Sequence, residues 1–319
     1  MKHFFLGLAT SLLASQNMAI GMAESQLHTL NNNIKSLSQS SLGDINNIAQ
    51  NYELEDFCPN PTPFVYMKCL ANDPSVPPEL LHKLAQRESD SLRLSVAANH
   101  NIFAKTAKML AQDKKADVRF HVAANKKTPL IVLKKLMNDE EDRVRSGVAK
   151  NPKTPLKWLQ ELSSDKSPHV RANVAENPNV PISILKKLTK DKTTFVREKV
   201  AQNPNTSSKI LQQLAQDKAS DVRYYVGKHP NTPVEVLVQL SKEDCKISVC
   251  GARGVAHNSD TPVKILKRLA QRKDDWYCRR NVALNPKTPA SVVFDLLSDR
   301  HYKVRNAARA AIKERNLQQ

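Results

Sequence analysis

The sequence contains few glycine and aromatic residues. Only 7 of its 319 residues are glycine, and Phe, Trp and Tyr together make up 5%. This scarcity fits an all-helical chain built on small and aliphatic side chains. The sequence also lacks a nucleophile elbow, a phosphate-binding loop, a paired-carboxylate motif and a metal signature. We therefore predict that the protein is not an enzyme and holds no cofactor, although a site assembled from distant segments would leave no such motif.

The five cysteines do not have the spacing of a metal site. No four of Cys58, Cys69, Cys245, Cys250 and Cys278 lie at tight ligand spacing, and the absence of a C-x-x-C pair disfavours zinc. A Cys250–Cys278 disulfide would need the local insertion to bring helices closer than their usual separation of roughly 8–10 Å. A local Cys58–Cys69 bridge is the alternative. Buried free thiols are expected instead if the compartment is reducing.

The N-terminal residues resemble an export signal. Lys2 and His3 precede a short apolar run, and Gly21-Met22-Ala23 offers small residues for cleavage, so residues 1–23 are a candidate signal peptide. The run is too short to span a bilayer, and we expect no transmembrane span in the mature chain. An amphipathic helix or a peripheral anchor is the alternative. A genuine signal predicts a periplasmic or secreted protein, and otherwise a cytoplasmic one. Residues 24–59 are polar and predict a linker or an N-terminal capping helix.

One pattern recurs from about residue 60 to the end of the chain. Residues Val144 to Asp165 read V-R-x-x-V-A-x-N-P-x-T-P-x-x-x-L-x-x-L-x-x-D. The second Val of this motif, or the apolar residue in its place, recurs at steps of 26 residues six times, and then at steps of 29, 27 and 26. About nine units follow, and a final helix from Val304 to about Asn316 is expected to close the array. These anchor residues are Leu70, Val96, Val122, Val148, Val174, Val200, Val226, Val255, Val282 and Ala308.

Each unit is predicted to contain two helices. The first ends at the Asn-Pro step, because the residue before proline is pushed out of the helical region. The second begins at Thr-Pro, where Thr offers a capping oxygen and Pro fits the first helical position. Leu130, Leu133, Leu136 and Met137 then form an apolar stripe that is expected to face the first helix. One unit alone buries too little apolar surface to offset the conformational entropy that it loses on folding. The units must therefore stack into a continuous α-solenoid over residues 60–319.

The motif resembles that of the leucine-rich repeat variant family, whose repeats are related in form to HEAT-like helical repeats. Asn-Pro, Thr-Pro and the spaced Leu carry the resemblance over roughly residues 60–315. The resemblance implies alternating short helices, one of them of α or 3₁₀ type, in a right-handed superhelix. The period here is slightly longer than the family's. One family member has an N-terminal iron–sulfur cluster, but Cys58 and Cys69 are fewer than the four thiolates that such a cluster normally needs, and we do not extend it to this chain.

Two repeated polar columns have structural interpretations. The Arg of each motif is preceded six residues earlier by Asp in several units, which predicts an Arg–Asp ladder between repeats. A guanidinium track for phosphates is the alternative interpretation. The motif Asn is expected to satisfy open backbone groups between the helices. The Arg column contains Arg93, Arg119, Arg145, Arg171, Arg197, Arg223, Arg279 and Arg305, and the Asp column contains Asp113, Asp139, Asp165, Asp191 and Asp217.

The variable positions are the better candidates for binding. The net charge is +18, and Lys recurs on the second helices, although a solvated face would look the same. Three extra residues interrupt the period around residues 245–254, where aromatic residues gather and His229 replaces the motif Asn. The candidate binding surface comprises Lys108, Lys134, Lys135, Lys186, Lys187, Tyr224, Tyr225, His229, Lys267, Arg268 and Trp276.

These features predict a non-catalytic repeat scaffold that binds a protein or peptide partner along its extended surface. The alternative is a basic solenoid that binds nucleic acid or another polyanion, since the Lys columns could contact several phosphates. The Lys columns themselves lack interleaved aromatic residues for base stacking. A base-excision enzyme on a HEAT-like scaffold rests on analogy of fold alone.

Overall fold

The computed structural model describes residues 63–245 and 249–318. The predicted signal peptide and polar linker lie outside the described residues. The chain divides into two compact units, residues 1–106 and residues 107–319. The described part of the first unit holds α3 (Pro63–Asn72), α4 (Pro78–Leu84) and α5 (Asp90–Ala98), and α6 (Ala104–Leu110) runs across the boundary.

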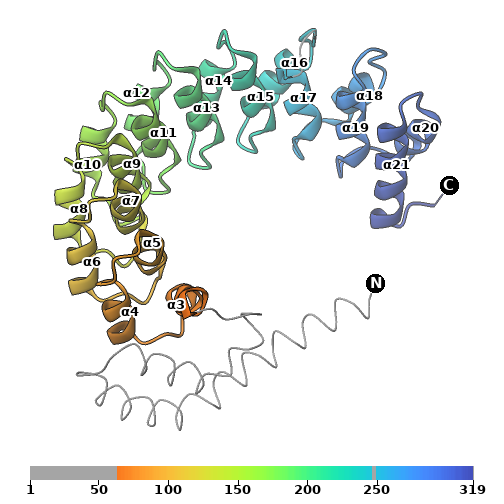
Figure 1. Cartoon of the computed structure of the whole chain (residues 1–319). Helices are drawn as coiled ribbons and strands as arrows, with labels where there is room; N and C mark the ends of the chain where they lie inside the picture. Colours follow the sequence, from red (N-terminus) through yellow and green to blue (C-terminus); the bar gives the residue numbers. More distant parts are fainter. Residues whose placement is uncertain (1–62, 246–248, 319) are drawn as a thin grey trace. The chain divides into compact units, whose positions relative to one another are not determined.

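The second unit is a series of helix pairs of about 26 residues, drawn in chain order in Figure 1. Neighbouring first helices pack against one another, and each second helix packs beside first helices, so the unit has two layers. The first helices are α7 (Ala116–Ala124), α9 (Asp142–Lys150), α11 (Pro168–Glu176), α13 (Thr194–Gln202), α15 (Ser220–Lys228), α17 (Gly251–His257), α19 (Trp276–Leu284) and α21 (Tyr302–Arg315). The second helices are α8 (Leu130–Leu136), α10 (Leu156–Leu162), α12 (Ile182–Leu188), α14 (Ser208–Leu214), α16 (Val234–Leu240), α18 (Val263–Ala270) and α20 (Ala290–Asp295), the last followed by the 3₁₀ helix η3 (Leu296–Ser298).

The motif letters explain where the helices begin and end. The motif Asn leaves the helix in an extended conformation, as at Asn151 with φ −66° and ψ 126°. The Thr does not cap the second helix as predicted. The buried Thr128 hydroxyl donates to the carbonyl of Val122 at 2.6 Å and so bonds back to the end of the first helix. Pro129 occupies the N-cap position, one residue earlier than predicted.

The core repeats with the same period. Val118 and Val122 on a first helix and Leu133 and Leu136 on the following second helix are at most 1% exposed. Leu130 is different, because it is 49% exposed although the sequence pattern placed it on the buried stripe. A two-turn helix buries only one side, and the Leu at its first position lies beyond the edge of that side.

The interruption at residues 245–254 shortens a helix and brings two helices close together. Helix α17 has 7 residues, where the other described first helices of the second unit have at least 9. A Cβ at Gly254 would lie 2.0 Å from the carbonyl oxygen of Tyr224, and one at Gly227 would lie 2.6 Å from the carbonyl oxygen of Gly251. Helices α15 and α17 therefore approach backbone to backbone, which only glycine permits.

Candidate binding surfaces

The Arg–Asp ladder is buried and joins successive repeats. The guanidinium of Arg145 donates to both carboxylate oxygens of Asp165, at 2.7 and 2.9 Å, and to the carbonyl of Asp139 at 2.9 Å. The side chains of Arg145 and Asp165 are only 8% and 9% exposed. The carboxylate partner is thus the Asp of the next unit, and the Asp six residues before the Arg contributes only its carbonyl. The same two-oxygen pairing joins Arg119 to Asp139, Arg171 to Asp191, Arg197 to Asp217, and Arg279 to Asp299.

The ladder determines the charge states of its members. Burial raises the pKa of Asp165, but hydrogen bonds from Arg145 and from the Ser167 N–H outweigh it, so the pKa lies below its ordinary value. The hydrogen bond to Asp165 raises the pKa of Arg145 further. Both groups stay charged at neutral pH and are already hydrogen-bonded to each other. These guanidinium groups are therefore unsuited to form a track for phosphates.

One ladder member was missed in the sequence. Arg253 precedes Arg279 by 26 residues, and its Nε lies 2.9 Å from Oδ1 of Asp275. In the other units that have this Arg, it lies three residues before the anchor, but Arg253 lies only two residues before the anchor Val255, so counting back from that anchor does not find it. Counting back from Arg279 would have found it. Arg223 is also paired, at 2.6 Å to Glu243, which takes the place of the column Asp.

The Asn column joins repeats as well. The side-chain amide of Asn151 donates to the carbonyls of Ala123 and Asn125 in the preceding unit, at 2.7 and 3.0 Å, while its oxygen accepts from the Lys153 N–H at 2.9 Å. Each motif Asn therefore ties a turn to the turn before it and satisfies groups that would otherwise be buried without partners.

His229 takes over this role and is not part of the molecular surface. It is 4% exposed, Nε2 lies 2.9 Å from the carbonyl oxygen of Asn203, and Nδ1 accepts from the Asn231 N–H at 3.0 Å. Since a carbonyl only accepts, Nε2 carries the proton and the ring is neutral. Burial lowers the pKa of His229. His229 therefore replaces Asn structurally, and we leave it out of the binding surface.

The predicted Lys and Arg residues lie on the exposed side of the second helices. Two of them also bond to the preceding unit. Nζ of Lys187 donates to the hydroxyls of Ser163 and Ser164, at 2.9 and 2.6 Å, and Arg268 donates to the Ser241 hydroxyl. These two side chains help to join repeats. The exposed basic residues of the prediction are Lys108, Lys134, Lys135, Lys186, Lys187, Lys267 and Arg268.

The same side carries an exposed apolar column that sequence reasoning missed. The residue after the motif proline is a large aliphatic one in five units, and it is between 41% and 57% exposed. Ser208 occupies this position in α14 and Ala290 in α20. We call this column and the basic residues beside it the second-helix face. The aliphatic members are Leu130, Leu156, Ile182, Val234 and Val263.

The predicted aromatic residues lie on the first helices instead. Tyr224 and Tyr225 are on α15 and Trp276 is on α19, all partly exposed. Burial and the neighbouring Tyr277 raise the pKa of Tyr224 to about 12, so it is neutral. The predicted surface therefore separates into two parts on different helices, with the basic residues on one and the rings on the other.

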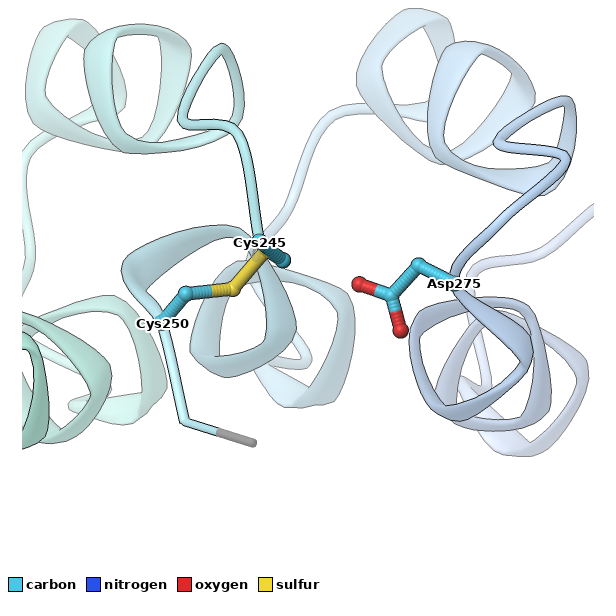
Figure 2. A group of neighbouring side chains, drawn as sticks. All are labelled: Cys245, Cys250 and Asp275. Atoms are coloured by element: carbon cyan, nitrogen blue, oxygen red, sulfur yellow. A yellow bond between two sulfur atoms is a disulfide. The ribbon is translucent and has the colours of Figure 1, made fainter. Parts of the chain in front are cut away.

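The cysteines near the interruption form one bond. Cys245 and Cys250 are joined as a disulfide with Cα atoms 5.6 Å apart, and the carboxylate of Asp275 lies beside it, as Figure 2 shows. Bridged sulfurs are not thiolate ligands, and Asp275 caps α19 and pairs with Arg253, so these groups do not suit a metal as they are bonded. Cys278 is a buried free thiol, not the partner of Cys250, and burial raises its pKa to about 12. Cys69 is disulfide-bonded, and Cys58 lies outside the described residues.

Comparisons with known proteins found solved structures that are similar to this chain. No protein-family model and no curated protein matches the chain. A solved leucine-rich repeat variant with a novel repetitive structural motif is 21% identical, with a TM-score of 0.48, over 71% of this chain and 88% of that one. An engineered protein is 14% identical, with a TM-score of 0.28, over 89% of this chain and 93% of that one. This chain is an all-helical repeat protein. Its own repeat geometry carries that statement.

The described helices were also compared with the length and hydropathy of a membrane span. None of them is both long enough and apolar enough to cross a bilayer.

Proposed function

We propose that the chain is a non-catalytic scaffold that binds an extended, acidic segment of a partner protein along its second-helix face. The observation that carries this proposal is the exposed aliphatic column, which recurs with the repeat. Leu130, Leu156 and Ile182 occupy it in three successive units and are 49%, 57% and 54% exposed. Contiguous exposed apolar surface is uncommon on a soluble chain unless it meets a partner.

The charges beside the column favour an acidic partner. Lys134 and Lys186 lie on the helices that Leu130 and Ile182 begin, and Lys157 directly follows Leu156. Among the described residues, none of these three Lys side chains has a carboxylate within 4.0 Å. Opposite charge on the partner would speed its association and select it over basic chains.

The repeat spacing suggests the pattern of the partner. Packed helices lie roughly 8–10 Å apart, and a chain in the extended polyproline II conformation advances about 3.1 Å per residue with three residues per turn, so that every third side chain lies on the same face. One apolar side chain in every three residues of the partner would therefore meet successive members of the column. Acidic residues between them would face the Lys side chains.

The non-catalytic part of the proposal is supported by the state of the reactive groups. The free thiol of Cys278 is buried, with its pKa raised to about 12, so it is a poor nucleophile at neutral pH. His229 is buried with both ring nitrogens bonded. The ladder carboxylates are paired with guanidinium groups.

We also propose that the protein works in an oxidising, exported location. The candidate signal peptide motivates this, and the disulfide-bonded state of Cys69, Cys245 and Cys250 supports it, because such bonds persist mainly outside the reducing cytosol. N-terminal sequencing of the mature protein from its native fraction tests it, with cleavage near Ala23 expected and an intact Met1 contradicting it.

Selection from a random peptide library displayed on phage tests the binding proposal. The whole protein should enrich acidic peptides with an aliphatic residue at about every third position. A variant with Leu130→Ser, Leu156→Ser and Ile182→Ser should lose at least tenfold in affinity for them, while Ser208 shows that the position accepts serine. The matched control replaces residues of the other layer, Phe195→Ser and Tyr302→Ser, which are also exposed.

Two outcomes would contradict the proposal. One is an enriched set that binds the serine variant as well as it binds the parent protein. The other is a pull-down from native extract in which nucleic acid or another polymer is recovered and no protein rises above background.

A further inference from the structure

The first helices near the C-terminal end of the chain carry many cations and a single acidic residue. Helices α17 and α19 contain no Asp or Glu, and α21 contains only Glu314. Together they carry several basic residues besides the paired ladder members. These are His257, Arg280, Lys303, Arg309, Lys313 and Arg315, and Lys228 and His257 lie close enough to interact electrostatically.

Two of these cations contact rings or other neutral groups rather than carboxylates. Nζ of Lys303 lies 4.9 Å from the ring centroid of Trp276, and Arg280 lies near the side-chain oxygen of Asn281 at 3.5 Å. Within residues 63–245 and 249–318, neither Lys303 nor Arg280 has a carboxylate at ion-pair distance. Their positive charge therefore remains open to an anion.

A hollow lies between the two helices that carry these groups. It has a volume of about 570 Å³ and is lined by Trp276, Tyr277, Arg280, Leu284, Lys303 and Asn306, with Ala307 and Ala310 also in its wall. Among the described residues, no carboxylate lines it. Its walls thus combine aromatic and aliphatic surface with two cations and one amide.

The rings around the hollow are held in place by their neighbours. Trp276 stacks on His301 with ring centroids 4.3 Å apart, and Arg253 lies 5.3 Å from the centroid of Tyr277 on the next helix. A ring that is fixed before a ligand arrives loses little freedom on binding, which favours stacking of a flat group against it.

We propose that this surface, made by Lys228, Trp276, Tyr277, Arg280 and Lys303, is a binding site for single-stranded nucleic acid. A base would enter the hollow beside Trp276 and Tyr277, while Arg280 and Lys303 bind the adjoining phosphates. Cations with interleaved rings are the combination that single-stranded nucleic acid requires, since each base has an exposed π-face. A duplex hides these faces, and an acidic peptide has no flat ring at each charge. The site lies on the first helices and is separate from the proposed peptide surface.

Fluorescence anisotropy of a labelled oligothymidylate of about 15 nucleotides tests the proposal with the disulfide-intact protein. Binding is expected at about 50 mM salt and should weaken steeply towards about 200 mM. Arg280→Ala with Lys303→Ala should weaken binding at least tenfold. Lys134→Ala with Lys186→Ala, which removes the same charge from the second-helix face, should change it less than twofold.

A second variant tests the rings. Trp276→Leu should weaken oligonucleotide binding by about five- to a hundredfold while its thermal melting shows that the protein is folded. Heparin and polyglutamate serve as anions without bases, and a duplex of equal length serves as a nucleic acid without exposed bases. The oligothymidylate is expected to bind more tightly than all three.

Several results would overturn the proposal. They are the absence of binding at about 50 mM salt, equal binding of heparin or duplex, and a folded Trp276→Leu variant that binds as the parent does. Tighter binding of polyglutamate at this site would assign it to a protein partner. Peptide binding by the second-helix face is measured separately, with the variant that carries serine at positions 130, 156 and 182. Failure of one proposal therefore does not decide the other.

Discussion

Helices α7 to α14 and helices α15 to α21 are built from the same repeat but treat their surface charges differently. In the first region, Arg143 pairs with Asp117 at 2.6 Å, and Lys199 pairs with Glu176. In the second region, Lys303 lies over the ring of Trp276 and has no such partner among the described residues. Arg143 and Lys199 are thus neutralised by carboxylates, whereas Lys303 stays available for a ligand.

The two regions also join their repeats differently. The regular region uses two-oxygen Arg–Asp pairs and Asn at every turn. In the irregular region His229 replaces Asn, Glu243 replaces Asp and glycine backbones meet between α15 and α17. The regular residues of the motif therefore join successive repeats. A substitution among them marks a place where the array changes its geometry.

Breaking the ladder in the regular region should have the largest effect on stability. Arg145→Ala leaves the buried Asp165 carboxylate without its guanidinium, and this should cost about 3–5 kcal/mol of unfolding free energy. Arg223→Ala should cost less, because Arg223 and Glu243 are 23% and 20% exposed. Urea unfolding followed by circular dichroism measures both. Equal losses in the two variants would contradict the difference between the regions.

The glycine contact should distinguish the regions next. Gly254→Ala places a Cβ 2.0 Å from a backbone oxygen and forces α15 and α17 apart, for an expected loss of about 3 kcal/mol. In Gly147→Ala the new Cβ lies 2.9 Å from the Cβ of Ala123. A gain in helix propensity of about 1 kcal/mol offsets part of the strain of that contact. Thermal unfolding of the two variants gives the comparison. A Gly254→Ala protein as stable as Gly147→Ala would disprove the backbone contact.

Reduction of the Cys245–Cys250 bridge should loosen only the irregular region. The two residues are separated by 5 in sequence, and closing so short a loop stabilises by about 2 kcal/mol. Hydrogen exchange with a reductant should increase in α17 and remain unchanged in α9, because repeat units act mainly on their neighbours. The variant Cys245→Ser with Cys250→Ser is the control for side effects of the reductant. Faster exchange in both helices would show that the bridge acts on the whole array.

His229 should make the irregular region sensitive to mild acid. Burial lowers its pKa in the folded protein, so between its unfolded pKa of about 6.5 and its folded pKa the unfolded chain binds the extra proton. Stability is therefore complete above about pH 6.5 and falls as the pH decreases, by at most about 1.4 kcal/mol per pH unit. His229→Asn should remove this part of the loss and change stability little at neutral pH. Denaturant titrations of both proteins across this range would refute the idea if the two curves stayed parallel.

Much of the fold follows from the motif alone. The period, the two helices per unit, the buried Val and Leu and the linking role of the Arg–Asp pairs all come from residue spacing, because a side chain that must face the next repeat must recur with it. Leu130 does not lie in the core, since spacing on a two-turn helix does not distinguish its buried side from the edge of that side. Thr128 does not cap the second helix, because its hydroxyl bonds to the first helix instead. The handedness of the superhelix stays a prediction.

Less of the candidate site could be predicted. Arg253 and the Cys245–Cys250 bridge depend on where three inserted residues are accommodated, and period counting does not locate that point. His229 looked like a surface ligand because sequence does not reveal that its ring replaces an amide. The exposed aliphatic column was visible as a repeated Leu, Ile or Val after the motif proline, but aliphatic residues on a helix were all assigned to the core.

The most direct test of the account measures both ligands against variants of both layers. The selected acidic peptide and the oligothymidylate are each titrated into the Leu130→Ser, Leu156→Ser, Ile182→Ser protein and into the Arg280→Ala, Lys303→Ala protein. The first variant should lose affinity only for the peptide, and the second only for the oligonucleotide, each by at least tenfold. If either variant lost both ligands, or if neither lost its own, the assignment of two separate binding surfaces would be wrong.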